Sequence, residues 1–194
     1  LYTNNPAWLL GRDGEQKLLN LGNADARRWL TDHVDKMLTE QGIDFYRQDF
    51  NLDPLPYWRA HDAPDRQGIT ENHYVTGYLT FWDALLQRFP KLVIDTCASG
   101  GHRNDLETLR RSVPLLRSDY IMEPVGQQCH TYGLAFWMPF FGTGTVAWGD
   151  AAYFITGKSP VESYGFWCSA CPSLNLLFDV REKELDYDKI RQLI

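Results

Sequence analysis

The stretch Val93-Ile94-Asp95-Thr96-Cys97-Ala98-Ser99-Gly100-Gly101-His102-Arg103-Asn104-Asp105-Leu106 runs from an apolar strand-like segment into a glycine-rich loop. Paired glycines let backbone amides approach a ligand closely, and the helix start predicted at Asn104 favours oxygen-rich groups. Such a loop suits sugar hydroxyls or a phosphate. It is not a nucleotide-binding loop of the usual kind, because no Lys-Ser or Lys-Thr follows the glycines.

On each side of this loop, a short strand-like segment leads to an aspartate. Residues 43–49 end on Asp49, and residues 113–118 are followed directly by Asp119. Carboxylates at the ends of different parallel strands can converge on one pocket, however far apart they lie in the sequence. A pair of facing carboxylates is the minimum catalytic apparatus of a glycosidase. The two aspartates and the loop between them are therefore the candidate site.

Each aspartate has neighbours that suit one half of a glycosidase reaction. Arg47, Asp49 and Asn51 share one side of an extended segment, and a nearby cation keeps a carboxylate ionised, as a nucleophile requires. Near Asp119, the carboxylate of Glu123 favours a protonated neighbour, as an acid requires. Taken alone, each aspartate also has a structural interpretation, as part of an Arg–Asp pair that caps a strand or as a turn or helix N-cap residue.

Strands and helices alternate along the chain, which is typical of an α/β fold with a parallel sheet. Chemistry at the C-terminal ends of several strands is the organisation of a (β/α)8 TIM barrel, which usually takes about 250 residues. We therefore interpret residues 1–194 as a single segment of such a barrel, its later five or six βα units, with the N-terminal strands missing. We expect strands at 7–10, 43–49, 92–96, 113–118, 144–148 and 174–178, and helices at 23–40, 73–89, 104–111, 129–137, 161–170 and 186–194.

Charge and hydropathy argue against two classes of partner, nucleic acids and membranes. The 194 residues carry a net charge of −6 with no basic run, which argues against nucleic acid. No apolar stretch reaches the roughly 18 residues of a membrane span. The chain begins Leu1-Tyr2-Thr3, without an initiator Met or a signal peptide, and it ends inside a helical pattern. We therefore interpret it as part of a longer chain, and the sequence holds no targeting signal from which to assign a localisation.

The four cysteines do not form a metal-site pattern. Cys168 and Cys171 have the C-x-x-C spacing of metal and redox sites, but no second such pair and no His pair completes a zinc set. A thioredoxin-like role needs the motif after a strand at a helix start, whereas here it lies in an aromatic, helical stretch. Buried structural thiols are the favoured interpretation, and no cofactor or metal is predicted.

Taken together and in this order, the two aspartates and the loop resemble the melibiase-like α-galactosidases of glycoside hydrolase family 36, in the clan that also contains families 27 and 31. The family's nucleophile lies in a Lys-Trp-Asp-x-Asn strand, whose Asp-x-Asn part is matched by Asp49-Phe50-Asn51. Its acid/base follows a serine, as in Ser118-Asp119. The resemblance runs from about residue 24 to residue 120. Its middle motif, Cys-x-x-Gly-Gly-x-Arg-x-Asp, is matched by Cys97, Gly100, Gly101, Arg103 and Asp105.

This resemblance implies a retaining glycoside hydrolase that acts on α-galactosides or related α-glycosides through a covalent glycosyl-enzyme. It implies that Asp49 is the nucleophile and Asp119 the acid/base. Arg47-Gln48 stands where the family has Lys-Trp, and because that Lys contacts sugar hydroxyls, the departure concerns the choice of sugar. The implied sugar-binding residues are Arg47, Gln48, Asn51, Cys97, Gly100, Gly101, Arg103 and Trp148.

Two other functions remain open on the sequence. A non-catalytic carbohydrate-binding barrel would tolerate the substitutions at Arg47-Gln48. A phosphate-binding TIM-barrel enzyme would use the Ser99-Gly100-Gly101 loop and hold a phosphate at the helix start near Asn104, but it leaves the two aspartates unexplained. Carbohydrate is the expected partner, rather than nucleic acid or a membrane. The sequence leaves room for a homo-oligomer and for contacts with the remainder of a parent chain.

Overall fold

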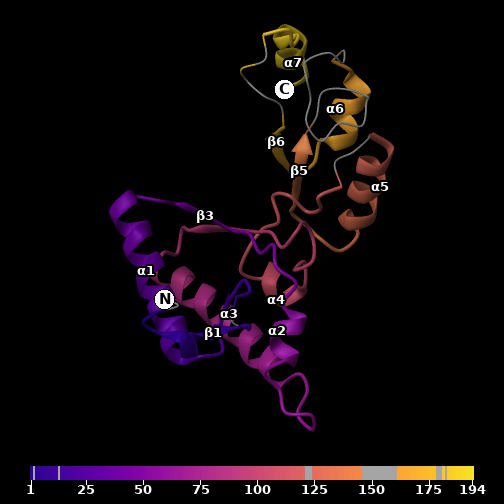
Figure 1. Ribbon diagram of the computed structural model, residues 1–194. Helices are drawn as coiled ribbons and strands as arrows, with labels where there is room; N and C mark the ends of the chain where they lie inside the picture. Colours follow the sequence, from indigo (N-terminus) through magenta and orange to yellow (C-terminus); the bar gives the residue numbers. More distant parts are fainter. Residues whose placement is uncertain (2, 13, 121–123, 146–160, 178–180, 182) are drawn as a thin grey trace. The chain divides into compact units, whose positions relative to one another are not determined.

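The chain folds into helices and short strands, most of which are labelled in Figure 1. The computed structural model describes residues 1–194 except 2, 13, 121–123, 146–160, 178–180 and 182. The described strands are β1 (Leu9–Leu10), β2 (Leu18–Leu19), β3 (Phe45–Gln48), β4 (Val93–Thr96), β5 (Gly142–Thr145) and β6 (Ser173–Leu176). The described helices are the 3-10 helix η1 (Pro6–Trp8), α1 (Ala24–Gln41), α2 (Leu55–Arg59), α3 (Ile69–Arg88), α4 (Leu106–Leu109), α5 (Pro124–Ala135), α6 (Ser163–Ser169) and α7 (Tyr187–Leu193).

Local capping explains why α1 begins and ends close to its predicted boundaries. The side chain of Asn23 accepts hydrogen bonds from the amides of Asp25 and Ala26, at 2.9 and 3.0 Å. Gly42 ends the helix at φ 63°, a left-handed conformation that glycine adopts without strain. Between the strand predicted at 43–49 and the helix predicted at 73–89, the structure adds the short helix α2, and α3 already begins at Ile69.

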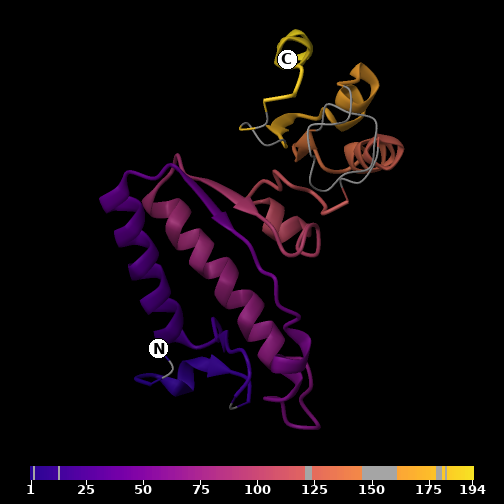
Figure 2. The same cartoon turned by 45° about the horizontal axis from the view of Figure 1, so that its top comes forward.

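One compact unit contains Leu1–Tyr46, Asn51–Ile94 and Leu106–Arg111. At its centre α1 and α3 run side by side, as Figure 2 shows. The segment predicted as a strand at residues 7–10 is a 3-10 turn followed by the short strand β1, which pairs antiparallel with β2. The apolar stripes that the two long helices bury are Ala26, Val34 and Leu38 on α1, and Tyr74, Tyr78, Phe81, Trp82 and Leu85 on α3.

A second compact unit contains Arg47–Phe50, Asp95–Asp105 and Ser112–Ile194. In it β5 and β6 pair in parallel, with Gly142 opposite Ser173. The helices α5 and α6 pack against each other. Its C-terminal core cluster is made of Val161, Phe166, Leu185 and Ile190. The described residues of the candidate site belong to this unit, except Asn51, which belongs to the first unit.

The strands β3 and β4 are hydrogen-bonded neighbours that run in the same direction. The amide of Val93 donates to the carbonyl of Asp44, and the amide of Cys97 donates to the carbonyl of Gln48, so the offset between the strands stays constant. An isolated bridge joins Asp95 to the next segment in the same parallel sense. Parallel pairing of consecutive strands is the arrangement predicted for an α/β fold.

The strand predicted at residues 113–118 is not regular, and this part of the prediction was wrong. Only Val113 forms a bridge with β4. Pro114 has no amide hydrogen to donate. The amide of Leu115 donates to the side chain of Asp95, at 2.9 Å, rather than to a strand carbonyl. The ladder therefore stops, although the segment still lies beside β4.

Among the described residues, no helix is long and apolar enough to cross a membrane. Nor do the described residues include a cluster of three or more His, Cys, Asp or Glu that could hold a metal ion. All four cysteines are free: Cys97 and Cys168 are buried, Cys171 is half-buried and Cys129 is exposed. The expectation of a buried thiol is therefore confirmed for Cys168, which lies in α6.

Candidate active site

Asp49 lies immediately after β3, at the C-terminal end of the strand, as predicted. Its Oδ1 accepts a hydrogen bond of 2.8 Å from the amide of Phe50. The guanidinium Nη2 of Arg47 lies 3.8 Å from Asp49 Oδ2, and the thiol of Cys97 shares a hydrogen bond with the same carboxylate. The Asp49 side chain is 38% exposed. It is therefore partly open to solvent, with a cation and a thiol beside it.

Arg47 is held mainly by the buried carboxylate of Asp95. Arg47 Nη1 donates to Asp95 Oδ2, and the side chain of Asp95 is only 3% exposed. Burial lowers the pKa of the Arg47 guanidinium, but the hydrogen bond to Asp95 and the negative charges around the guanidinium outweigh burial and leave that pKa raised. Arg47 is therefore a permanent cation between two carboxylates.

Burial raises the pKa of the Cys97 thiol, and the hydrogen bond and negative charge of Asp49 raise it further. These effects outweigh the nearby Arg47 cation and a backbone hydrogen bond involving Gly100, which lower the pKa of the thiol. The sulfur therefore stays protonated at neutral pH. In this form it can donate a hydrogen bond without adding a further negative charge next to Asp49.

The glycine loop turns sharply after β4 and passes very close to the segment of Asp119. Ser99 and Gly100 have left-handed backbones, at φ 43° and 81°. A Cβ at Gly100 would lie 2.6 Å from the amide nitrogen of Asp119, and one at Gly101 would lie 2.6 Å from the carbonyl oxygen of Arg117. Glycine is therefore needed at both positions for close backbone packing, and not only for a turn.

The side chain of Arg103 joins the ends of β3 and β4. Its Nη2 donates to the carbonyls of Gln48 and Cys97, both at 2.9 Å, and its Nε donates to Thr96 Oγ1 at 3.2 Å. The guanidinium also lies 5.9 Å from the ring centroid of Phe50. These contacts fix the backbone that precedes Asp49 to the backbone that precedes the glycine loop.

Arg117, two residues before Asp119, is the largest buried polar side chain near the site and is 1% exposed. Its Nη2 donates to the carbonyl and Oε1 of Gln127 and to Thr131 Oγ1, at 3.0–3.1 Å. The guanidinium lies 5.4 Å from the ring centroid of Phe141. Burial lowers the pKa of Arg117. These bonds attach the segment that carries Asp119 to α5.

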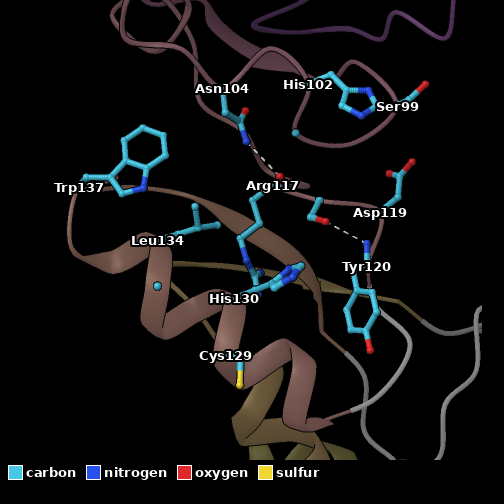
Figure 3. A pocket seen from close by; sticks show the side chains of 13 residues that line it. Ser99, His102, Asn104, Arg117, Asp119, Tyr120, Cys129, His130, Leu134 and Trp137 are labelled. Atoms are coloured by element: carbon cyan, nitrogen blue, oxygen red, sulfur yellow. Dashed lines mark hydrogen bonds between the residues drawn. The ribbon is translucent and has the colours of Figure 1, made fainter.

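Asp119 lines a cavity of about 620 Å³, shown in Figure 3. Its carboxylate extends towards the loop of Ser99 and His102, in agreement with the close approach of Gly100. Opposite this loop, α5 and the residues after it contribute His130 and Trp137 to the lining. An aromatic ring, an imidazole and a carboxylate around one cavity suit a sugar, which presents both apolar faces and hydroxyls.

The structure groups the predicted residues in two sets of contacts. Arg47, Gln48, Asp49, Cys97 and Arg103 are joined by direct bonds at the ends of β3 and β4. Gly100 and Gly101 lie against the segment of Asp119. Among the described residues predicted for catalysis or sugar binding, Gly101 and Asp119 line the cavity, together with Ser99 of the same loop. Asn51 is exposed just after β3. Trp148 and Glu123 lie outside the described residues.

The sequence did not single out three residues near the site, and it indicated Asn104 only as a helix start. Asp95 could have been noticed as a charged residue inside an apolar strand. Asn104 donates from Nδ2 to the carbonyl of Arg117 at 3.0 Å, which no local pattern indicates. His130 and Trp137 come from a helix and its C-terminal turn, and only the fold brings them to Asp119.

Comparisons with known proteins agree on one family. A family model described as Melibiase matches residues 1–144. The α-galactosidase Mel36A of Lactobacillus acidophilus is 27% identical over 113 residues, which is 55% of this chain and 15% of that protein. A bifunctional α-galactosidase/sucrose kinase of Mediterraneibacter gnavus is 25% identical over 151 residues, which is 74% of this chain. The chain spans 15% of the length of each of these two relatives.

Solved structures match nearly the whole chain. A variant of the family 36 α-galactosidase AgaA of Geobacillus stearothermophilus, in complex with stachyose, covers 99% of this chain with a TM-score of 0.78 and 18% identity. The α-galactosidase AgaB of the same organism also covers 99%, with a TM-score of 0.77 and 20% identity. In each case the match takes up 27% of the solved chain. At these identities the likeness is one of fold.

Proposed function

The chain belongs to the melibiase family, and we propose that it is the later part of a (β/α)8 barrel whose parent enzyme hydrolyses α-galactosides. Residues 1–194 would then be a single segment of the catalytic domain, with the earlier strands supplied by the rest of the parent chain. The parallel neighbours β3 and β4, the bridge at Val113 and the parallel pair β5–β6 support this interpretation.

The observation that carries the proposal is the surroundings of Asp49. A carboxylate at a strand end, partly exposed and flanked by a permanent cation and a protonated thiol, has what an anionic nucleophile needs. In the proposed reaction, Asp49 attacks the anomeric carbon, and the glycosidic bond breaks as a glycosyl-enzyme ester forms. Arg47, Gln48, Asn51 and Cys97 would bind the sugar beside it.

Asp119 is proposed to act from the other side of the glycosidic bond. It gives its proton to the leaving oxygen in the first step and takes a proton from water in the second. Its place on the wall of the cavity and against Gly100 supports this role, because the cavity offers room for the leaving group. The Gly100-Gly101 loop, Arg103 and Trp148 would complete the sugar site.

We propose galactosides of the raffinose type as substrates. AgaA of Geobacillus stearothermophilus has been solved with stachyose and with raffinose, and this chain shares its fold. Arg47 stands at the position of the family's sugar-contacting Lys, and its fork of N–H donors can reach sugar hydroxyls as a Lys does. An α-linked galactosyl group would then lie next to the side chain of Asp49.

The test is hydrolysis of an aryl α-galactoside by the intact protein, with proton NMR of the first sugar released. We expect α-galactose first, since a retaining enzyme inverts twice. An Asp49→Asn variant, which keeps the shape and loses the charge, is the matched control and should be inactive. Binding of galactosides without hydrolysis would favour the carbohydrate-binding alternative. Binding of inorganic phosphate near Asn104 without hydrolysis would favour the phosphate-binding one.

A further inference from the structure

The cavity beside Asp119 has a wall to which the proposed reaction assigns no role. We propose that this wall, formed by Trp137 and His130, binds the leaving group and selects glycosides whose leaving group is itself a neutral sugar. This inference rests on the proposed function, because it takes Asp119 as the acid that protonates the leaving oxygen.

The lining of the cavity shows which side of the glycosidic bond it serves. Among the described residues, Asp119 lines the cavity and Asp49 does not. The galactosyl carbon has to reach the nucleophile, whereas the leaving group lies on the side of the proton donor. The cavity therefore serves the leaving group. Its volume of about 620 Å³ is within the range of about 300–1,000 Å³ that small-molecule sites occupy.

Two side chains join the walls of the cavity, whose described lining residues belong to the second compact unit. Asn104, in the glycine loop, donates from Nδ2 to the carbonyl of Arg117 at 3.0 Å. The buried guanidinium of Arg117 in turn donates to Gln127 and Thr131 on α5. The loop, the segment of Asp119 and α5 are therefore held together, and a ligand that enters meets groups already in place.

Trp137 supplies an aromatic face to this cavity. Its amide donates to the carbonyl of Leu134 at 3.1 Å, in the turn after α5, and the next residue, Met138, is buried. The turn fixes the backbone, while the indole stays 47% exposed and lines the cavity across from Asp119, as Figure 3 shows. An aromatic face in such a place can pack against the C–H face of a sugar ring, whereas a leaving group of one atom cannot cover it.

His130 supplies a polar group to the same wall. It is half-buried on α5, and its ring centroid lies 5.2 Å from that of Tyr120, the residue after Asp119. Burial lowers the pKa of the imidazole, and the positive charge of Arg117 lowers it further. The imidazole is therefore neutral at neutral pH, with one nitrogen that donates and one that accepts a hydrogen bond. A sugar hydroxyl, which also donates and accepts, matches it better than an anion, which only accepts.

The experiment compares raffinose with α-galactosyl fluoride as substrates of the intact protein. Fluoride leaves as a single atom, whereas the leaving group of raffinose is a disaccharide. Trp137→Ala should lower the ratio of kcat/KM for raffinose to kcat/KM for the fluoride by about 10-fold, the scale of one lost aromatic contact. Trp137→Phe keeps a ring and should restore most of the ratio.

A second pair of variants tests the imidazole independently. His130→Ala should lower the same ratio by about 3- to 10-fold, as the loss of one hydrogen bond does. His130→Gln keeps a donor and an acceptor and should lose less. Because the ratio compares two substrates on one sample, it does not depend on the fraction of folded protein.

The matched control is Phe136, the residue next to Trp137. It is 74% exposed and packs edge to face on Tyr132, with 5.0 Å between the ring centroids. Phe136→Ala removes an aromatic ring from the same turn and should leave the ratio unchanged. Thermal unfolding of each variant shows whether the turn and α5 remain folded.

Each result decides a different point. An unchanged ratio in Trp137→Ala or in His130→Ala would overturn the inference, and so would an equal fall in Phe136→Ala. If Trp137→Ala does not fold, His130→Ala decides alone. An unvaried protein that cleaves the fluoride but not raffinose would overturn the inference, while the proposed hydrolysis of α-galactosides would stand. An unvaried protein that cleaves neither substrate would overturn the proposed function, and the inference would fall with it.

Discussion

Replacing Gly100 by alanine should lower kcat while the protein still folds, because the glycine packs against the backbone of the proposed acid/base. An added Cβ would lie 2.6 Å from the amide nitrogen of Asp119 and 3.3 Å from its Cγ. Ordinary contact begins at 3.4 Å, so the Asp119 backbone must move by roughly 0.8 Å. Displacements of about 1 Å can cost about 10²-fold in rate. We therefore expect kcat to fall roughly 10- to 100-fold.

The chain offers a matched control for the backbone strain. Gly14 has φ 83°, against 81° for Gly100, and a Cβ at Gly14 would meet nothing within 4 Å. A left-handed backbone costs an alanine about 1–2 kcal/mol, so both variants should lose a similar amount of unfolding free energy from this source. Only Gly100→Ala should also displace Asp119.

The assay is kcat for aryl α-galactosides with good and poor leaving groups, together with thermal unfolding of each variant. Because Asp119 is the proposed proton donor, Gly100→Ala should lose most on the poor leaving group. Gly14→Ala should keep its kcat. Equal activity of the two variants, at equal loss of stability, would refute the argument that the loop positions Asp119.

Three further predictions follow from the same contacts. Asp49→Ala should lose activity on every substrate, and azide should restore turnover with inverted configuration. Asp119→Ala should lose most activity on substrates with poor leaving groups, and azide should restore its turnover with retained configuration. Equal losses in the two variants without azide rescue would contradict both roles. Gly101→Val should weaken substrate binding, since its side chain would press on the carbonyl of Arg117, and an unchanged KM in a folded variant would count against the loop. Iodoacetamide should alkylate Cys97 slowly at pH 7, as measured by peptide mass spectrometry, because burial raises the pKa of its thiol and Asp49 raises it further. Asp49→Asn removes the negative charge, which lowers that pKa and should speed the reaction. An unchanged rate would contradict the thiol–carboxylate contact.

The sequence predicted those parts of the fold that depend on local signals. The ends of α1 follow from Asn23 and Gly42, and the strand β3 was expected because a strand-like segment, residues 43–49, follows the end of that helix. The strand predicted at residues 113–118 failed for two reasons. Pro114 lacks an amide hydrogen, which the sequence itself shows. The amide of Leu115 donates to a side chain of the neighbouring strand, which no pattern within the segment indicates.

In the candidate site, too, the residues marked by a local motif were predicted, and those placed by the fold were not. Asp49, Asp119 and the glycine pair were found because motif spacing marks them, and their roles stay predictions. The separation of the two carboxyl groups, expected at about 5–5.5 Å for a retaining enzyme, also stays a prediction. Asp95 was passed over as part of a strand, although a charge in an apolar run is costly unless it is paired. Its partner Arg47 lies 48 positions away, a separation that only the parallel pairing of β3 and β4 closes.

The hydrogen bonds of Arg103 to two backbone carbonyls determine which positions of this site can change, over evolution or in the laboratory. Its Nη2 binds the carbonyl oxygens of Gln48 and Cys97, which every amino acid provides. These two hydrogen bonds therefore do not depend on which side chain stands at position 48. Saturation mutagenesis there should yield many folded variants with altered sugar preference, whereas the same library at position 103 should yield few folded proteins. Sugar preference can therefore change through substitutions at position 48, while Arg103 keeps the backbone around Asp49 in place.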